Sequence, residues 1–305
     1  KLEKEQIDIY FARANIYHKD KNYKESANCL KLANKLKLIH SPSKADALIN
    51  QSKVLLFESD KQDIYSFKKR EHPQSIFIVG MPRSGSTLLE SILSKNNSVN
   101  DLGEINILEE SFLEWKKYNK EYNLSKLYWK KITSQKNEFK ISTNKWLYNY
   151  QYTGIIANNI SNAKVIHCYR NPLDNILSIF RAHFSKGNEY SSSLIDSARV
   201  YLDQERIMAE YKNRFRSKIY DLDYDLLVKN PSQEIKNLIS WLEWKWDDSY
   251  LSPHLNQRSV STASSAQVRS PINSKSIGGW KNYKEMLQPA IEIITKTKKY
   301  RDLIA

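Results

Sequence analysis

A glycine-rich turn between an apolar run and a helical run constrains the fold of this chain more than any other feature. Residues 80–87 read GMPRSGST, which has the spacing G-x-x-x-x-G-K-[ST] of a phosphate-binding loop, with Ser86 at the position of the lysine. The preceding residues 75–79 (SIFIV) have the composition of a buried strand, and residues 87–94 have helical spacing. Strand, loop and helix in this order predict an anion-binding site at the start of the helix.

The residues of the loop suit an oxyanion. Gly80 and Gly85 let the backbone turn tightly, so that its N–H groups can point inward. Three further residues, Ser84, Ser86 and Thr87, add hydroxyl donors. A Gly/Ser turn that opens an ordinary helix is the simpler alternative, but it leaves the strand in front of the loop unexplained.

The missing lysine argues for an anion other than a nucleoside triphosphate. In nucleoside triphosphatases the loop lysine reaches the β- and γ-phosphates. Here Ser86 stands in its place, and Arg83 supplies a guanidinium, which can bind two oxygens of an oxyanion at once. We therefore interpret the loop as a cradle for a phosphosulfate.

Strand and helix patterns alternate from residue 75 onward, which predicts an α/β fold with a mostly parallel sheet covered by helices on both faces. Further strands are expected at residues 140–143, 164–169 and 218–220, and helices at 172–184, 191–213 and 232–243. Residues 253–279 are rich in Ser, Gly and Pro and predict a long loop with a functional role.

The first forty residues predict a helical hairpin, with amphipathic runs at residues 6–19 and 23–38. The packing positions of a tetratricopeptide repeat are matched by Phe11, Ala14, Tyr17, Leu30 and Ala33 and missed by Arg13 and Ser26. A plain helical hairpin is the alternative. We divide the chain into a tetratricopeptide-like hairpin (1–40), a helical connector (41–73) and an α/β domain (74–305). One repeat cannot bury its own face, so the hairpin is expected to contact further repeats, the next domain or a protein partner.

The charge balance favours an anionic partner. The 305 residues contain 48 Lys+Arg against 34 Asp+Glu, a formal charge of +14. This excess alone does not choose among a nucleic acid, an anionic surface and an anionic substrate. Because the lysines are scattered and no zinc-finger or RNP-type signature is present, we expect a nucleotide ligand and no nucleic-acid partner.

No apolar stretch approaches the roughly 20 residues of a membrane span, and no secretory signal is visible at the start. The chain begins at Lys1 without a methionine, so a native leader could precede it. Cys29 and Cys168 are the only cysteines, and neither a disulfide framework nor a cysteine metal site is expected. A reducing, cytoplasmic location fits best.

Several separated motifs follow the loop in a fixed order. They are Gly103-Glu104, Asn144-Lys145, Arg170 with Ser178, YDLLV at 224–228, and QVRSP at 267–271 with GGW at 278–280. Together with the loop, this order resembles the sulfotransferases, specifically the bacterial tetratricopeptide-repeat sulfotransferases, which are distantly related to tyrosylprotein sulfotransferases. The resemblance runs from about residue 6 to residue 283. It implies a P-loop-like α/β fold that transfers a sulfuryl group from 3′-phosphoadenosine-5′-phosphosulfate (PAPS) to a hydroxyl, without a required metal.

The resemblance also implies which residues bind the nucleotide. The segment that holds the 5′-phosphosulfate is matched by Arg83, Ser84, Gly85, Ser86 and Thr87. Arg170 and Ser178 match the pair that binds the 3′-phosphate of PAPS and of its product adenosine 3′,5′-bisphosphate (PAP). This pair explains why ATP would be a poor substitute.

A tyrosine and a late loop complete the implied nucleotide site. Tyr224 matches a nucleotide-associated tyrosine, although packing at a core edge is nearly as good an explanation. On the late loop that closes over the nucleotide, the matching residues are Gln267, Arg269, Lys275 and Trp280. Tyrosylprotein enzymes place a lysine before the tryptophan, where this chain has Gly279; Arg269, Lys275 or Lys281 would have to replace it.

Two further residues match catalytic positions of the family. Glu104 matches the glutamate that takes the proton of the acceptor, and Lys145 matches the lysine that neutralises the departing bridging oxygen. The surroundings of Lys145 differ, because the family usually carries Asp at the position of Trp146 and Pro near Leu147. Glu104, Lys145 and Arg83 are therefore the catalytic candidates.

The acceptor stays open. Tyrosylprotein sulfotransferases place arginines shortly after their glutamate, whereas this chain has none between Glu104 and Arg170, and only Lys116 and Lys117 could stand in. A protein tyrosine, a glycan, a lipid headgroup and a small alcohol are all compatible. Two other functions stay open as well: a P-loop kinase that uses ATP, against which Ser86 argues, and a non-catalytic tetratricopeptide scaffold, against which Glu104 and Lys145 argue.

Overall fold

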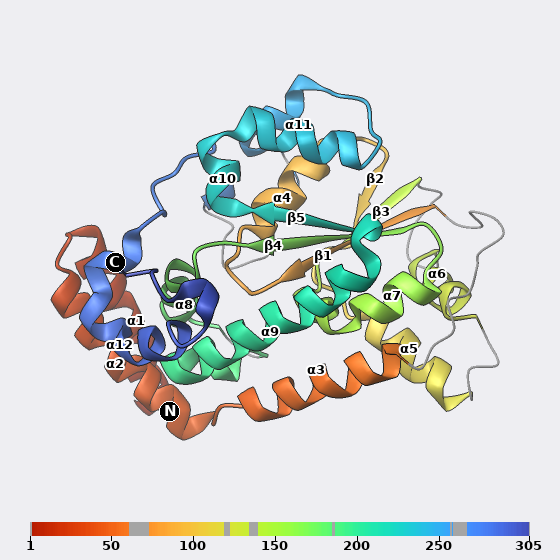
Figure 1. Cartoon of the computed structure of the whole chain (residues 1–305). Coiled ribbons are helices and arrows are strands. Elements are labelled where there is room, and N and C mark those ends of the chain that lie inside the picture. Colours follow the sequence, from red (N-terminus) through yellow and green to blue (C-terminus); the bar gives the residue numbers. More distant parts are fainter. Residues whose placement is uncertain are drawn as a thin grey trace. The chain divides into compact units, whose positions relative to one another are not determined.

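Five short strands form one parallel sheet in the order β2-β3-β1-β4-β5 (Figure 1). The strands are β1 (Gln74–Gly80), β2 (Val99–Asp101), β3 (Ile141–Asn144), β4 (Ala163–Tyr169) and β5 (Ile219–Asp223). Four of them confirm the predicted strands. β2 was not predicted, because three residues are too few to show the alternation of a strand.

The computed structural model describes residues 2–60, 73–118, 123–133, 140–184, 187–256, 258 and 267–304. The chain divides into two units. The first unit comprises Lys1–Asn50, Arg170–Asp203 and Ser274–Ala305, and the second comprises Gln51–Tyr169 and Gln204–Asn273. The sheet belongs to the second unit. Of the predicted connector 41–73, residues 61–72 lie outside the described residues, and residues 45–60 form the helix α3 (Ala45–Asp60).

Helices cover both faces of the sheet in the second unit, as the alternating pattern predicted (Figure 1). Ile76 and Ile78 of β1 face one apolar core, and Phe77 and Val79 face the other, as the period of two in a strand requires. The first core is completed by α4 (Ser86–Leu93), α10 (Tyr224–Lys229) and α11 (Pro231–Trp241). The second is completed by α5 (Ile107–Lys117), α6 (Leu124–Thr133), α7 (Thr153–Asn159) and the last turns of α9 (Leu194–Phe215).

The parallel register brings the carboxyl ends of three strands to one edge. Gly80 at the end of β1 lies opposite Cys168 of β4, and Tyr169 lies opposite Asp223 at the end of β5. The phosphate loop therefore begins at the edge where ligands bind in open parallel sheets.

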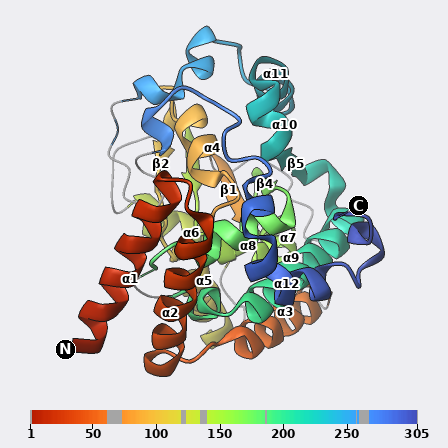
Figure 2. The same cartoon turned by 90° about the vertical axis from the view of Figure 1, so that its left-hand side faces the viewer.

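The first unit contains the predicted helical hairpin, α1 (Leu2–Lys19) and α2 (Tyr23–His40), whose helices lie side by side (Figure 2). The predicted packing residues Phe11, Ala14, Leu30 and Ala33 are buried. The same unit holds α8 (Pro172–Phe180) and α12 (Lys284–Ile294). A tetratricopeptide relationship stays a prediction.

The predicted helix at 172–184 is too long, because α8 ends at Phe180. The carbonyl oxygen of Phe180 accepts a hydrogen bond from Asn34 Nδ2 at 2.9 Å, and that of Phe184 accepts one from Lys37 Nζ at 2.9 Å. Side chains of α2 thus satisfy carbonyl groups at and beyond the end of α8, where the helix itself leaves them unpaired. Within the described ranges, no helix is long and apolar enough to cross a bilayer. The cytoplasmic location stays a prediction.

A hydrogen-bonded chain of side chains ties the hairpin to the rest of the first unit. Arg181 Nη1 donates to His18 Nε2 at 3.1 Å, so Nδ1 carries the imidazole proton and donates to the Tyr283 hydroxyl at 2.7 Å. Tyr283 donates to Ser26 Oγ at 2.9 Å, and Ser26 donates to the carbonyl oxygen of Ala14 at 2.8 Å. Burial and the neighbouring Arg181 lower the pKa of His18 to about 4.

The hydrogen bonds of His18 predict that the folded protein loses stability in acid. Because His18 is neutral in the folded state and charges near its ordinary pKa in the unfolded state, its contribution is present above about pH 6.5 and is lost as the pH falls to about 4. The melting temperature of His18→Gln should therefore fall less between about pH 7 and about pH 4.5 than that of the parent protein. Equal falls in both proteins would show that His18 does not carry this pH dependence.

Candidate active site

The phosphate loop has a backbone that its glycines permit. Gly80 has φ +141°, and a Cβ there would lie 2.2 Å from the carbonyl oxygen of Cys168. Gly85 has φ +96°, and a Cβ there would lie 2.2 Å from the ring of Tyr224. The ring of Tyr224 thus packs directly on the loop in the second unit. Arg83 also adopts a left-handed conformation, with φ +66°, which is uncommon for a residue with a Cβ.

The hydroxyl groups of the loop are enclosed. Ser84, Ser86 and Thr87 are all buried, and Ser84 Oγ has no hydrogen-bond partner among the described residues. Helix α4 starts at Ser86, and its N-cap Gly85 offers no side chain to the first N–H groups. An enclosed hydroxyl without a partner and a helix start without a side-chain cap fit an anionic ligand, whose oxygens would satisfy both.

Arg83 is held by the late loop. Its Nη2 donates to Gln267 Oε1 at 3.0 Å, so the second unit brings these two predicted residues together. Arg269 is placed differently, because its guanidinium donates to the carbonyl oxygens of Asn256 and of Arg258, the latter at 2.6 Å. In the structure Arg269 thus holds the carbonyl groups of Asn256 and Arg258.

Glu104 and Lys145 meet as a salt bridge. Lys145 Nζ lies 2.5 Å from Glu104 Oε1, although Lys145 is fully buried and the Glu104 side chain is 46% exposed. The strands place them, because Lys145 follows β3 and its backbone N–H donates to the carbonyl oxygen of Gly103 at 2.9 Å. Asn144 Oδ1 accepts from the backbone N–H of Trp146 and from Asn149 Nδ2, both at 3.0 Å, and so fixes the turn after Lys145. An accessible carboxylate thus adjoins a buried ammonium.

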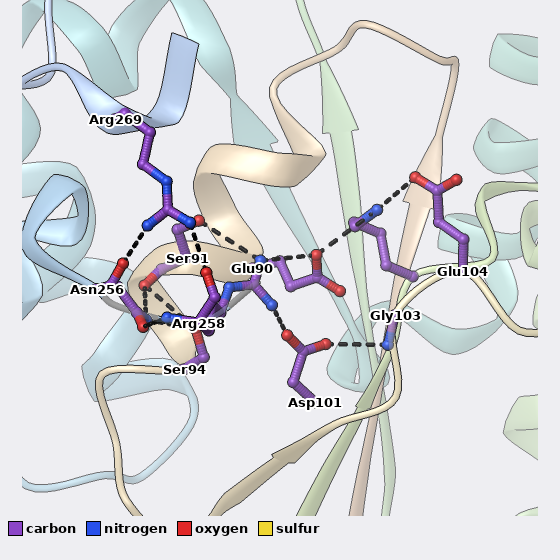
Figure 3. A network of polar contacts seen from close by, with 10 residues as sticks. Glu90, Ser91, Ser94, Asp101, Gly103, Glu104, Asn256, Arg258 and Arg269 are labelled. Carbon is purple, nitrogen blue, oxygen red and sulfur yellow. Dashed lines mark hydrogen bonds and ion pairs between the residues drawn. The ribbon is translucent and has the colours of Figure 1, made fainter. Parts of the chain in front are cut away.

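Three residues that sequence analysis missed extend this pair into a network (Figure 3). Glu90 Oε2 lies 3.6 Å from Lys145 Nζ and accepts from Arg258 Nη2 at 2.9 Å. Arg258 Nη1 pairs with Asp101, whose Oδ1 accepts from the backbone N–H of Gly103 at 3.0 Å. Glu90 had one signal in the sequence, since it is the single charged residue in the apolar run of α4. Arg258 had none, because it is 168 residues away from Glu90.

The first unit arranges the other predicted residues around α8. Arg170 is buried, and its Nη2 donates to the carbonyl oxygen of Ser276 at 2.9 Å. Asp174, one turn further on, accepts from the backbone N–H groups of Gly278 at 2.7 Å and of Trp280 at 2.9 Å. Arg170 and the GGW motif are therefore held on one scaffold. Ser178 lies half-buried on the same helix.

Packing does not explain why this chain has Gly279 where tyrosylprotein sulfotransferases place a lysine. A Cβ at Gly279 would meet Asp174 Oδ1 at 3.8 Å, an ordinary contact distance. Lys275 and Lys281 are exposed in this unit.

The loop, Glu104, Lys145, Tyr224 and the pair Gln267 and Arg269 belong to the second unit, whereas Arg170, Ser178 and Trp280 belong to the first. The described ranges contain no group of three or more His, Cys, Asp or Glu side chains that could hold a metal ion.

A model of the sulfotransferase family matches residues 73–248 of the sequence. The chain belongs to this family. The matched segment includes the phosphate loop, Glu104, Lys145 and Arg170, and it ends before the late loop.

One curated relative and two solved structures are similar to this chain. An uncharacterised protein of Aquifex aeolicus is 31% identical over 252 residues, which are 74% of this chain and 33% of that protein. The chain thus spans about a third of the length of this curated relative. The sulfotransferase domain of the curacin biosynthetic pathway matches the fold with a TM-score of 0.51 at 18% identity, over 72% of this chain and 96% of that domain. The sulfotransferase domain of the Synechococcus PCC 7002 olefin synthase matches with a TM-score of 0.52 at 15% identity, over 75% and 97%.

The contact between Gly85 and Tyr224 predicts that the phosphate loop of this member of the sulfotransferase family does not accept a side chain at position 85. Gly85→Ala should lower the free energy of unfolding by about 2 to 5 kcal/mol, because left-handed strain and a clash with the ring act together. The matched control is Gly187→Ala, since Gly187 has φ +82° but a Cβ there would meet no atom of the described residues within 4 Å, and it should cost about 1 to 2 kcal/mol. Urea unfolding measures both, and equal costs would contradict the packing of Tyr224 on the loop.

Proposed function

We propose that this chain transfers a sulfuryl group from PAPS to a hydroxyl group of an acceptor, as a PAPS-dependent sulfotransferase. The observation that carries the proposal is the 2.5 Å contact between Glu104 and Lys145 in the unit that also holds a lysine-free phosphate loop. Membership of the sulfotransferase family supports the reaction class.

The loop would hold the 5′-phosphosulfate. Backbone N–H groups at the start of α4 and the enclosed hydroxyl of Ser84 would donate to its oxygens, and Arg83 would add a charge-assisted pair of hydrogen bonds. The contact of Arg83 with Gln267 supports this role, since a guanidinium already fixed by a neutral partner loses little freedom on binding. No metal is needed in this arrangement, because the protein itself supplies the positive charge.

Glu104 and Lys145 would divide the transfer between them. Glu104 would take the proton of the acceptor hydroxyl while the acceptor oxygen forms a bond to sulfur. The bond between sulfur and the bridging oxygen breaks, and Lys145 would donate a hydrogen bond to that oxygen as negative charge develops on it. The products are the sulfated acceptor, PAP and a protonated Glu104.

Arg170 and Ser178 are proposed to bind the 3′-phosphate, and Tyr224, Gln267, Arg269 and Trp280 to complete the nucleotide site, on the family resemblance. The fixed place of Arg170 on the α8 scaffold supports this assignment. The helical hairpin is proposed to serve a protein partner. The acceptor is a hydroxyl of a protein tyrosine, a glycan, a lipid headgroup or a small alcohol.

The two other functions are less well supported. A P-loop kinase would use a loop lysine at the position of Ser86, and a purely binding scaffold would gain nothing from an accessible carboxylate beside a buried ammonium. A screen with radiolabelled PAPS in excess EDTA tests all three functions, with a tyrosine peptide, an oligosaccharide, a lipid vesicle and p-nitrophenol as acceptors. Label on one acceptor supports the proposal. A chain that transfers phosphate from ATP only when magnesium is restored is a kinase.

Nucleotide selectivity gives the first prediction from this function. Arg170→Ala should weaken PAP binding by roughly tenfold or more, since a charge-assisted hydrogen bond contributes about 1.5 to 3 kcal/mol. Binding of adenosine 5′-monophosphate, which lacks the 3′-phosphate, should change little. Isothermal titration with both ligands measures the difference, and equal losses would refute the assignment of the 3′-phosphate.

The general base gives the second prediction. Glu104→Gln should lower kcat by roughly 10²- to 10⁴-fold with little change in PAP affinity, because a base acts in the transition state. Turnover is measured with the acceptor found in the screen, and PAP affinity by calorimetry on the same folded variant. Near-normal turnover would mean that another group takes the proton.

A further inference from the structure

Glu90 is a carboxylate in an unexpected place. It lies four residues after Ser86 on α4, one helical turn beyond the phosphate loop, and only 2% of its surface is exposed. A buried carboxylate is destabilising unless charged or hydrogen-bonding groups compensate it, and a negative charge there does not help an anion to bind. Its partners therefore explain its presence.

Those partners are two cationic side chains of the second unit that lie far from Glu90 in the sequence. Oε2 of Glu90 accepts from Arg258 Nη2 at 2.9 Å and lies 3.6 Å from Lys145 Nζ, while Oε1 has no hydrogen-bond partner among the described residues. Lys145 also contacts Glu104, so its ammonium contacts two carboxylates. One of them is buried, and the other is 46% exposed.

The two carboxylates differ in what the proposed reaction does to them. Glu104 becomes neutral when it takes the proton of the acceptor, and its attraction for Lys145 then weakens. Glu90 is buried and takes no proton in the proposed reaction. An ammonium has three N–H donors, so Lys145 can contact both carboxylates and still offer one N–H to the leaving oxygen.

We propose that Glu90 is a positioning residue, which holds the ammonium of Lys145 in place while Glu104 changes its charge. This inference rests on the proposed function. Glu90 acts through Lys145 and touches no reacting atom. Glu90 lies on the helix that begins at the phosphate loop, so it would fix the position of Lys145 relative to the sulfate donor held by that loop.

Glu90 is itself held by a closed ring of contacts. Arg258 joins Glu90 to Asp101, and Asp101 accepts from the backbone N–H of Gly103, the residue before Glu104. The ring closes because Glu104 contacts Lys145, which contacts Glu90 (Figure 3). Arg258 is thus the second anchor of Glu90, and its own segment is fixed by Arg269.

The first experiment separates turnover from binding. Glu90→Gln keeps the shape of the side chain and removes its charge, so kcat should fall roughly tenfold or more while PAP affinity changes by less than about threefold. The assay follows the release of labelled sulfate from PAPS to water, which needs no identified acceptor. Glu110→Gln is the matched control, because Glu110 is a 60% exposed carboxylate on α5, and it should change neither quantity.

The second experiment tests whether Glu90 acts through Lys145. In a Lys145→Met background, Glu90→Gln should lower the residual kcat by less than about twofold, because the group that it positions is gone. A full tenfold loss in that background would overturn the proposal, as would an unchanged kcat in the single variant. If Glu90→Gln does not fold, Glu90→Asp replaces it, because the shorter side chain keeps the charge but withdraws it from Lys145.

Melting temperatures of the same four proteins test the contact without any turnover. If Glu90 and Lys145 are coupled, the melting temperature of the double variant should fall by clearly less than the sum of the falls in the two single variants. Additive losses would refute the Glu90–Lys145 link even in an active enzyme. A parent protein that neither binds PAP nor releases sulfate would instead refute the proposed function, and the melting temperatures would still decide the link.

Discussion

Lys145 carries a charge on a side chain with no exposed surface, and much of the second unit is arranged around that ammonium. A buried charge is tolerated only when it is paired and hydrogen-bonded. The pairing comes from two directions, since Glu90 lies on the helix after the phosphate loop and Glu104 lies on the turn after β2. The position of one nitrogen atom therefore depends on a helix, on two strands and on the segment that carries Arg258.

The parallel sheet makes this convergence possible. Since β1, β2 and β3 are parallel neighbours, the loop after Gly80, the turn at Gly103 and the residue after Asn144 all leave from the same edge. The turn at Gly103 and the residue after Asn144 are joined directly, because the backbone N–H of Lys145 donates to the carbonyl oxygen of Gly103. The side chains that contact each other are therefore placed mainly by backbone pairing, which leaves little freedom for their relative position.

The sequence contained the parts of this site that local chemistry determines. The apolar run at 75–79 and the alternation of strands and helices predicted four of the five strands. The order of the motifs from the loop to residues 278–280 carried the resemblance to the sulfotransferase family. Residues 107–117 were within reach of the same analysis, because Leu108, Phe112 and Trp115 have the spacing of a helix face. Two other contacts could not be predicted in this way: that of Glu90 with Arg258, and that of Asn34 with the carbonyl oxygen of Phe180 at the end of α8. Each joins residues more than a hundred positions apart in the sequence.

The closed ring through Glu90, Arg258, Asp101 and Gly103 limits which substitutions this sequence can accept. Arg258 serves two carboxylates, so its replacement would leave Asp101 without this cation and Glu90 with Lys145 alone, whereas the loss of Asp101 would still leave Arg258 with Glu90. A single substitution at position 258 is therefore expected to cost more than one at position 101. We therefore expect positions 90, 101 and 258 to change together over evolutionary time, although position 258 lies far from the other two in the sequence.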